Sequence, residues 1–313
     1  MTVFTTLAPA KINLGLFLGP TRPQDEKHEL ATVMQSISLA DELTLSPAPE
    51  EANTNTDTVI CPGVEGDNLA AKALSAFREA TGWDAPPQQL EIVKRIPVAA
   101  GLGGGSADAA AALRLAQAAS GLGNEDLLRA LGAQLGADVP AQVTPGRWLA
   151  TDAGERLDRL PDPTTPLEIL ILPSDEQLST AAVYEEADRL GAQRTSRALA
   201  ERADDLRSAL SHGAALPAAG ELLHNDLQRA AVALCPSIAT TLEQLQEAGA
   251  DPERTFVSGS GPTVVAVFAR TPGAPKAELL AELVRERLAE RRPPAAIARP
   301  LPAPFVTICH ESR

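Results

Sequence analysis

The sequence predicts an α+β protein built in two halves. The chain has 313 residues, which is long for one domain and comfortable for two. Short apolar or alternating runs typical of strands are interleaved with longer stretches whose apolar residues recur at helical spacing. Pro161, Pro163 and Pro166 lie close together near the middle of the chain. We therefore place a boundary there, with one domain over residues 1–162 and a second over residues 163–313.

In the first half, strands and helices alternate. The expected strands are rich in apolar or β-branched residues and cover residues 2–7, 12–18, 37–45 (with Asp41 and Glu42 at a turn), 90–93, and a hairpin of 148–150 with 156–160. The expected helices carry apolar residues at helical spacing and cover residues 68–81, 106–120 and 125–135. Asn68 is the expected N-cap of the first helix, and Gly121 and Gly136 end the other two.

The second half contains more helix. The expected strands cover residues 168–172, 255–257, 263–268 and 304–308. The expected helices cover residues 180–190, 197–210, 219–233, 238–248 and 276–290. Residues 292–304, which are rich in proline and alanine, are expected to form a linker.

Composition and charge exclude several classes of protein. Hydrophobic residues make up 44% and charged residues 22%, as in ordinary globular proteins. The formal net charge of −14 argues against a nucleic-acid surface, because phosphate backbones attract Lys and Arg. No run approaches the roughly 18 apolar residues of a membrane span. The start of the sequence does not resemble a signal peptide, and the three cysteines form no CxxC pair, so we expect a cytoplasmic protein.

The strongest functional signal is the stretch "PVAAGLGGGSADAAAAL", residues 97–113. Glycines let backbone N–H groups approach a ligand with no Cβ in the way. A helix that begins at Ser106 points free N–H groups and the positive end of its dipole at the same place. The combination predicts an anion site, and phosphate is its commonest occupant. The residues of this site are Gly101, Leu102, Gly103, Gly104, Gly105 and Ser106, with Ser106 as N-cap.

Three other interpretations of this stretch agree less well with its residues. A P-loop requires a lysine directly after the glycines, and none follows. The dinucleotide-binding fingerprint requires a different glycine spacing and an acidic residue about 20 residues further on, which here is the loop 121–124. A bare tight turn is the remaining structural alternative. Asp108 is expected in the first helical turn, where an acid favours the helix dipole.

Two further stretches accompany the glycine loop. They are "PAKINLGL" (residues 9–16) and "VSGSGPTVVAVF" (residues 257–268). With "PVAAGLGGGSADAA" between them, the three resemble the three motifs of the GHMP kinases and occur in the same order. The resemblance implies an ATP-dependent, Mg²⁺-requiring small-molecule kinase. It also implies a ribosomal-S5-like α/β N-terminal domain and a ferredoxin-like α+β C-terminal domain.

Within this family, "GDNLAAKAL" and "LGADVPAQV" narrow the resemblance. Together with the three motifs they are most similar to the branch that phosphorylates the 2-hydroxyl of cytidine diphosphate methylerythritol in non-mevalonate isoprenoid synthesis. The resemblance implies no nucleic-acid or membrane partner. A kinase for a mevalonate-type or homoserine substrate, a non-catalytic nucleotide-binding relative, and a nucleic-acid binder on the S5-like fold remain alternatives. The charge argues against the last.

The resemblance assigns catalytic roles to two residues, Asp138 and Lys11. The sequence around each of them does not by itself indicate such a role. By spacing, Asp138 is only a turn former after a helix, and Lys11 a lysine in an apolar stretch. The family pattern makes Asp138 the catalytic base and Lys11 its partner, which holds the carboxylate ionised. Asn13 lies two residues beyond Lys11 on the same side of a strand, and is a candidate neighbour of the substrate.

The remaining candidates bind the nucleotide or the acceptor. The resemblance places the ATP phosphates on the glycine loop, with Lys94 and Asn68 as further nucleotide contacts. For the cytidine end the family has an aromatic residue before a histidine, and here Lys27 precedes His28. The other candidates for binding the phosphoryl acceptor are Thr180, Tyr184, Gly259, Ser260 and Gly261. The last three lie in a glycine-rich loop whose residue types, taken alone, are also typical of a turn between two strands. No carboxylate cluster indicates the Mg²⁺ ligands.

Overall fold

Two long strands organise the fold. The computed structural model describes residues 2–49, 55–64, 66–214, 222–269, 277–290, 293–302 and 307–312. In it, β1 (Thr2–Thr21) and β2 (His28–Pro47) pair antiparallel and are joined by a hairpin tip at residues 22–27. The runs predicted separately at 2–7, 12–18 and 37–45 are parts of these two strands. The pairing register shifts between Pro9 and Lys11, where the proline has no N–H to give to a neighbouring strand.

The strands form two sheets. The shorter strands are β3 (Thr58–Ile60), β4 (Gln88–Val93), β5 (Arg147–Thr151), β6 (Arg156–Arg159), β7 (Leu167–Leu172), β8 (Thr255–Val257), β9 (Val264–Ala269), β10 (Ala296–Ala298) and β11 (Cys309–Ser312). The first sheet has the order β11-β1-β2-β4-β3, with β5 paired to β2 and β6 to β5. The second has the order β10-β7-β9-β8 and is antiparallel. The predicted boundary between residues 162 and 163 lies between β6 and β7.

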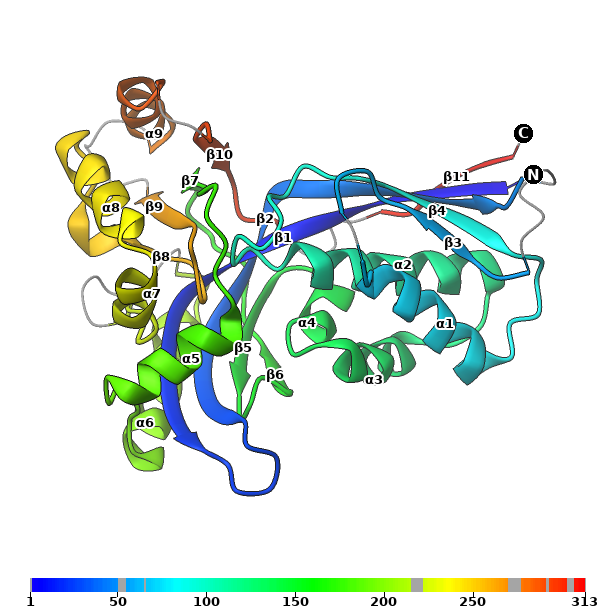
Figure 1. Cartoon of the computed structure of the whole chain (residues 1–313), viewed down its shortest axis with the longest axis horizontal. Coiled ribbons are helices and arrows are strands. Elements are labelled where there is room, and N and C mark those ends of the chain that lie inside the picture. The colour runs from blue at the N-terminus through cyan, green and yellow to red at the C-terminus, as the bar shows by residue number, and fades with distance from the viewer. Residues whose placement is uncertain are drawn as a thin grey trace.

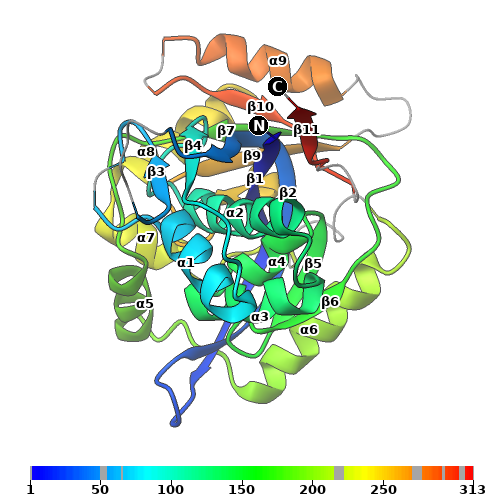
Figure 2. The ribbon, with the colours of Figure 1, turned by 90° about the vertical axis from the view of Figure 1, so that its right-hand side faces the viewer.

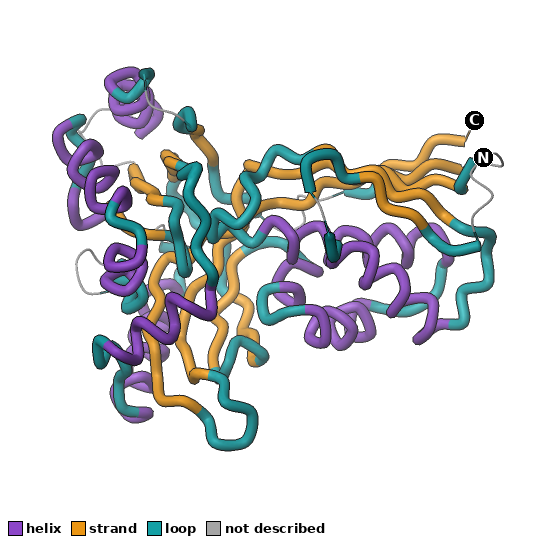
Figure 3. The backbone as a smooth tube through the Cα atoms, viewed as in Figure 1, coloured by secondary structure: helices purple, strands orange, loops and turns teal. Residues whose placement is uncertain are grey.

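Helices cover the sheets. They are α1 (Leu69–Thr81), α2 (Gly104–Ser120), α3 (Glu125–Leu135), α4 (Val139–Val143), α5 (Thr180–Arg189), α6 (Ser196–Leu210), α7 (Gln228–Leu234), α8 (Ser237–Glu247) and α9 (Ala277–Arg287). Figures 1 and 3 show α1–α4 together on one face of the first sheet, with α7–α9 toward the other end of the molecule. Both predicted halves therefore mix helix and sheet, which confirms the α+β class.

The alanine-rich helix α2 lies at the centre of the first half. Figure 2 shows it between the strands of the first sheet and the helices α1, α3 and α4. Ala109–Ala112 are fully buried. Because alanine adds little width, α2 packs closely against neighbours on several sides. This tight packing fixes the position of the helix start, and with it the glycine loop.

Several element predictions are wrong in detail. Asp41 and Glu42 lie inside β2 rather than at a turn. The predicted helix 219–233 is helical only from Gln228, since residues 222–227 run irregularly and 215–221 lie outside the described residues. The predicted linker contains β10. Of the predicted strand 304–308, residues 304–306 lie outside the described residues, and the strand found there is β11.

The C-terminal strand returns to the first half. β11 pairs antiparallel with β1, where Thr2 lies opposite Ser312 and Thr5 opposite Cys309. It forms the edge of the first sheet next to β1. The first sheet is thus completed by residues from the far end of the sequence.

Candidate active site

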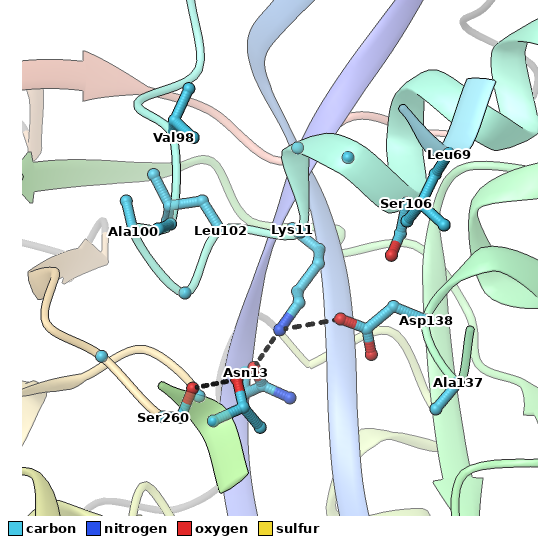
Figure 4. Close-up of a pocket in the computed structure, with 18 of the residues that line it drawn as sticks. Lys11, Asn13, Leu69, Val98, Ala100, Leu102, Ser106, Ala137, Asp138 and Ser260 are labelled. Carbon is cyan, nitrogen blue, oxygen red and sulfur yellow. Dashed lines mark hydrogen bonds and ion pairs between the residues drawn. The ribbon is translucent and has the colours of Figure 1, made fainter. Parts of the chain in front are cut away.

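A cavity of about 570 Å³ lies where the three motif segments meet. Lys11 and Asn13 reach it from β1, and the glycine loop forms one wall. Asp138 enters from the segment between α3 and α4, and Gly259–Gly261 from the turn between β8 and β9. Figure 4 shows these residues facing one space. Segments separated by up to about 250 residues of sequence therefore contribute to one site.

The glycine loop makes backbone contacts that side chains would block. Gly101 has φ +74°, and a Cβ there would lie 2.6 Å from the carbonyl oxygen of Ser258. Gly103 has φ +69°, and a Cβ there would lie 2.9 Å from Cγ of Lys11. The glycines are thus required both by their left-handed conformation and by the close approach of two other motif segments.

Helix α2 begins two residues earlier than predicted. Its N-cap is Gly103, and no side chain caps it, so the prediction that Ser106 is the N-cap is wrong. The left-handed Gly103 turns the chain directly into the helix and leaves Ser106 within the first turn. The N–H groups of the first turn have no partner inside the helix, and here no capping side chain occupies them. Gly104, Gly105 and Ser106 line the cavity, so this helix start is open to an anion.

Lys11, Asn13 and Asp138 come together as expected. The Lys11 ammonium lies 3.3 Å from Oδ2 of Asp138 and donates a 2.8 Å hydrogen bond to Oδ1 of Asn13. The Asn13 amide donates in turn to Thr32, whose hydroxyl donates to the Gly15 carbonyl. This chain of hydrogen bonds holds the ammonium in one position at the cavity wall.

The two charges of this pair differ in exposure. The Lys11 side chain is 8% exposed, whereas that of Asp138 is 35% exposed. Asp138 lies between α3 and α4 with its side chain capping neither helix. The carboxylate therefore remains open to the cavity, where it can accept a proton from a bound hydroxyl group.

Lys94 is held by two buried carboxylates. Its ammonium contacts Asp41 of β2 and lies 2.7 Å from Oδ2 of Asp108 of α2. Asp41 also accepts hydrogen bonds from the backbone N–H groups of Arg95 and Ile96, directly before the glycine loop. The sequence analysis missed Asp41 because it read that residue as part of a turn. Asp108 is the fifth residue of α2, so its predicted place in the first turn is wrong.

This cluster has unusual electrostatics. Burial, only partly offset by Lys94 and reinforced by Asp41, raises the pKa of Asp108 to about 7. Its Oδ1 is buried without a hydrogen-bond partner among the described residues. Burial disfavours the charge of Lys94, but the two carboxylates outweigh it and raise the pKa of the ammonium.

Asn68 and several apolar side chains line the cavity. Asn68 is the N-cap of α1, as predicted, and its side chain accepts a 2.8 Å hydrogen bond from the N–H of Ala70. Asn68 lines the cavity together with Leu69, Val98 and Ala99. A polar group among apolar side chains is typical of a pocket for a flat heterocycle.

Tyr184 and His28 lie side by side. Their ring centroids are 5.2 Å apart, and Nε2 of His28 lies 3.3 Å from Asp188. Tyr184 lines the cavity, whereas His28 stands behind it. Burial, with a smaller effect of Asp138, raises the pKa of Tyr184 to about 12, so its hydroxyl stays protonated. Lys27 is exposed at the hairpin tip.

The third motif forms a tight turn. The Thr180 hydroxyl lies 3.0 Å from that of Ser260 and ties the turn to the start of α5. The N–H of Gly261 donates to the carbonyl of Ser258 within the turn, so this N–H is not free to bind a ligand. The N–H groups of Gly259 and Ser260 have no partner in the described part of the chain. Asn225 was not predicted from the sequence, although its side-chain amide donates hydrogen bonds to the carbonyls of Val257 and Gly259.

The cavity carries more negative than positive side chains. Asp67, Asp108 and Asp138 line it, against Lys11 and Lys94. No group of three or more His, Cys, Asp or Glu side chains among the described residues has the geometry to hold a metal ion. An anionic ligand would therefore depend on backbone N–H groups and on a cation that it brings with it. In the described parts of the chain, no helix has the length and apolar character of a membrane span.

Comparisons with known proteins match nearly the whole chain to one family. The model of the GHMP kinases N terminal domain matches residues 68–146, and that of the GHMP kinases C terminal domain matches residues 197–291. A "4-diphosphocytidyl-2-C-methyl-D-erythritol kinase" of Leifsonia xyli subsp. xyli is 38% identical over 306 residues, which cover 94% of this chain and 97% of the relative.

Two solved structures share the fold. A crystal structure of 4-(cytidine 5'-diphospho)-2C-methyl-D-erythritol kinase matches with a TM-score of 0.69 and 29% identity, over 94% of this chain and 98% of the other. A homoserine kinase from Cytophaga hutchinsonii matches with a TM-score of 0.67 and 13% identity, over 98% and 97% of the two chains. The second likeness concerns the fold alone.

Proposed function

This chain belongs to the GHMP kinase family, and we propose that it transfers the γ-phosphoryl group of ATP to the 2-hydroxyl of 4-diphosphocytidyl-2-C-methyl-D-erythritol, in the cytoplasm, for isoprenoid precursor synthesis. The observation that carries the proposal is the Lys11–Asp138 pair, which faces the uncapped start of α2 across one cavity. The choice of acceptor is supported by the similarity to relatives of that name over nearly the whole chain.

The nucleotide would lie along the glycine loop. The free N–H groups of the first turn of α2 bind the phosphates, and Gly101 and Gly103 let the backbone approach them. Asn68 and the apolar side chains beside it receive the base, with Lys94 close to the same wall. Positioning and charge stabilisation of this kind supply most of the catalysis in phosphoryl transfer.

Asp138 would act as the general base. The acceptor oxygen attacks the γ-phosphorus, the bond from that phosphorus to the bridging oxygen of ADP breaks, and the hydroxyl proton passes to Asp138. The Lys11 ammonium, 3.3 Å from Asp138, orients the carboxylate and attracts the developing negative charge. Asn13 keeps Lys11 in place and is near enough to bind the acceptor.

The acceptor would extend from Asp138 toward Tyr184. The Tyr184 ring offers a face for the cytosine, and Asp188 and Tyr184 fix the orientation of His28 behind it. Thr180, Gly259 and Ser260 border the middle of this path. Lys27 at the exposed tip supplies no second aromatic face, so we expect base stacking on one side only.

Mg²⁺ would enter with the nucleotide. The described residues around the cavity offer no cage of protein ligands for the ion, so the phosphates themselves would supply its principal ligands. When bound, the ion neutralises phosphate charge. Ser106, in the first turn of α2, and Asp138 both line the cavity and are the side chains that would hold the ion there.

An ADP-release assay tests the proposal. The purified protein is offered ATP and Mg²⁺ with 4-diphosphocytidyl-2-C-methyl-D-erythritol, mevalonate or homoserine in separate reactions. We expect turnover of the first alone, and competitive inhibition against it by CMP. Preferential turnover of mevalonate or homoserine would reject the proposed acceptor, and ATP binding with no turnover of any alcohol would reject catalysis itself.

A further inference from the structure

The segment before α7 crosses β1 as a short, strand-like piece. The N–H of Leu16 donates a 2.8 Å hydrogen bond to the carbonyl of His224, and the N–H of Asp226 donates a 2.9 Å bond back to that of Leu16. Asn225 thereby pairs in parallel with Leu16. Asn and Asp compete with the backbone for hydrogen bonds and are unfavourable inside helices, which is why the chain is not helical here.

Asp226 anchors this segment. Its carboxylate accepts two 2.7 Å bonds from the Arg194 guanidinium and a 2.9 Å bond from the N–H of Leu18 in β1. His224 lies 3.0 Å away. Although burial opposes the charge, these donors lower the pKa of Asp226 to about 2. The segment is therefore fixed firmly to the strand that carries Lys11 and Asn13.

Asn225 extends from this anchor to the third-motif turn. Its amide nitrogen donates 2.8 Å hydrogen bonds to the carbonyls of Val257 and Gly259, and its Oδ1 accepts a 2.9 Å bond from the N–H of Leu227. The side chain is buried, at 6% exposure. The amide nitrogen thus joins the end of β8 to the turn, and because Oδ1 is used by Leu227, both ends of the side-chain amide are occupied within the protein.

The turn held in this way borders the reacting groups. A Cβ on Gly259 would lie 3.2 Å from Oδ1 of Asn13 and 3.4 Å from the Lys11 ammonium. The turn also carries the N–H groups of Gly259 and Ser260, which have no partner among the residues that the structure describes. Figure 4 shows Ser260 and Asn13 on the same side of the cavity. A shift of the turn would therefore move these donors relative to Lys11 and Asp138.

We propose that Asn225 is a positioning residue for phosphoryl transfer, which sets the distance between the third-motif turn and the Lys11–Asp138 pair. It joins the turn to β1, the strand from which Lys11 projects. The inference rests on the proposed function, since that function defines the reaction whose geometry Asn225 controls.

The test compares variants of Asn225 with a matched control. Gln228→Ala is the control, because its side chain accepts a hydrogen bond from the N–H of Val257, directly before the turn residues 258–261. Asn225→Ala removes the bonds to the turn. Asn225→Asp keeps the shape and the bond to Leu227 but turns a carboxylate toward two carbonyls, so it provides a second variant if the first folds poorly.

We expect both Asn225 variants to lower kcat by about tenfold or more, since displacements near 1 Å have effects of up to about 10². The KM for ATP should stay within about threefold, because the nucleotide wall is separate from the turn. Hydrogen exchange of residues 256–263 should accelerate in both variants. In Gln228→Ala, kcat and the exchange of Ser258–Gly261 should remain close to the wild type, at a similar Tm.

Three results would overturn the inference. The first is a kcat for Asn225→Ala equal to that of Gln228→Ala. The second is unchanged hydrogen exchange of the turn in both Asn225 variants. The third is a loss of kcat that is proportional to the fall in Tm across all the variants, the Gln228→Ala control included. The exchange measurement needs no substrate, so it still decides whether Asn225 holds the turn if the wild type fails to phosphorylate the proposed acceptor.

Discussion

Asp138 and Lys11 form a pair in which one charge is buried and the other is open. We predict that Asp138→Asn lowers kcat by about 10² or more, because the amide cannot accept the hydroxyl proton. Lys11→Met should cause a loss of similar size, since it leaves Asp138 without its ammonium partner. Steady-state kinetics measure both effects. Asp126→Asn, an exposed aspartate in the first turn of α3, is the matched control and should keep wild-type turnover. A kcat for Asp138→Asn within about threefold of the wild type would contradict the assignment of the base.

Gly101 is required both by its left-handed backbone conformation and by the close approach of the Ser258 carbonyl. A second glycine, Gly121, has only the first of these constraints and therefore allows the two to be tested separately. Gly121 at the end of α2 has φ +69°, close to the +74° of Gly101, but a Cβ there would meet nothing within 4 Å. We predict that Gly121→Ala costs about 1 kcal/mol of stability through backbone strain alone. Gly101→Ala should lower Tm further and also reduce turnover, because its Cβ would collide with the Ser258 carbonyl. Equal effects of the two substitutions on Tm and kcat would show that the close approach is unimportant.

Helix α2 is linked to β2 through the Asp41–Lys94–Asp108 cluster. The pKa of Asp108 in the folded protein, about 7, lies above its ordinary value of 3.8. The folded protein therefore retains a proton that the unfolded chain releases, and this group's contribution to stability falls as pH rises from about 4 through 7.

We predict that Asp108→Asn removes this pH dependence. The Tm of the wild type minus that of the variant should decrease between pH 5 and pH 7 and level off above about pH 8, as the carboxyl becomes fully ionised. Thermal unfolding across that range measures it. Parallel Tm profiles for the two proteins would mean that Asp108 ionises normally in the folded state.

The functional residues of the motif segments could be predicted from sequence, because in each segment they are close together in the chain. The glycines before α2, Asn68 before α1 and the Lys11–Asn13 spacing in a strand all have local causes. Asp41 and Asn225 could not be predicted in this way. Each is an ordinary polar residue in its own segment, and its hydrogen-bond partners lie more than 30 residues away. The partners of Asp41 are Arg95 and Ile96, and those of Asn225 are Val257 and Gly259.

Local propensity also misplaced several boundaries. The start of α2 was expected at Ser106, because serine is a good N-cap, but the left-handed Gly103 begins the helix earlier. The run 219–233 looked helical by its alanines and leucines, yet the hydrogen bonds of Asn225 and Asp226 to other segments override that preference in residues 222–227. Tertiary contacts decide such cases, and they have no signature in a window of sequence.

The whole molecule is strongly acidic, and so are the proposed substrates. The formal net charge is −14, and the cavity itself is lined by more carboxylates than ammonium groups. The field of the protein therefore opposes the approach of ATP and of a diphosphate-bearing acceptor, in contrast to the attractive fields that accelerate binding at cationic sites.

We predict an unusual salt dependence. Raising ionic strength from about 0.01 M to about 0.15 M shortens the Debye length from about 30 Å to about 8 Å and screens this repulsion. At constant free Mg²⁺, kcat/KM for the acceptor should rise about two- to threefold. Initial rates at several KCl concentrations measure it. A steep fall with salt would instead reveal a cationic approach path that outweighs the net charge.

The pairing of β11 with β1 has a consequence for biosynthesis. The residues of β1 are synthesised long before those of β11, the strand that covers its edge. Until then the nascent protein presents an unpaired strand edge, the kind of surface on which chains associate wrongly. Contacts between such distant parts of a sequence also slow folding. Completion of the first sheet, and with it the final position of the strand that bears Lys11, thus has to wait until β11 has been synthesised.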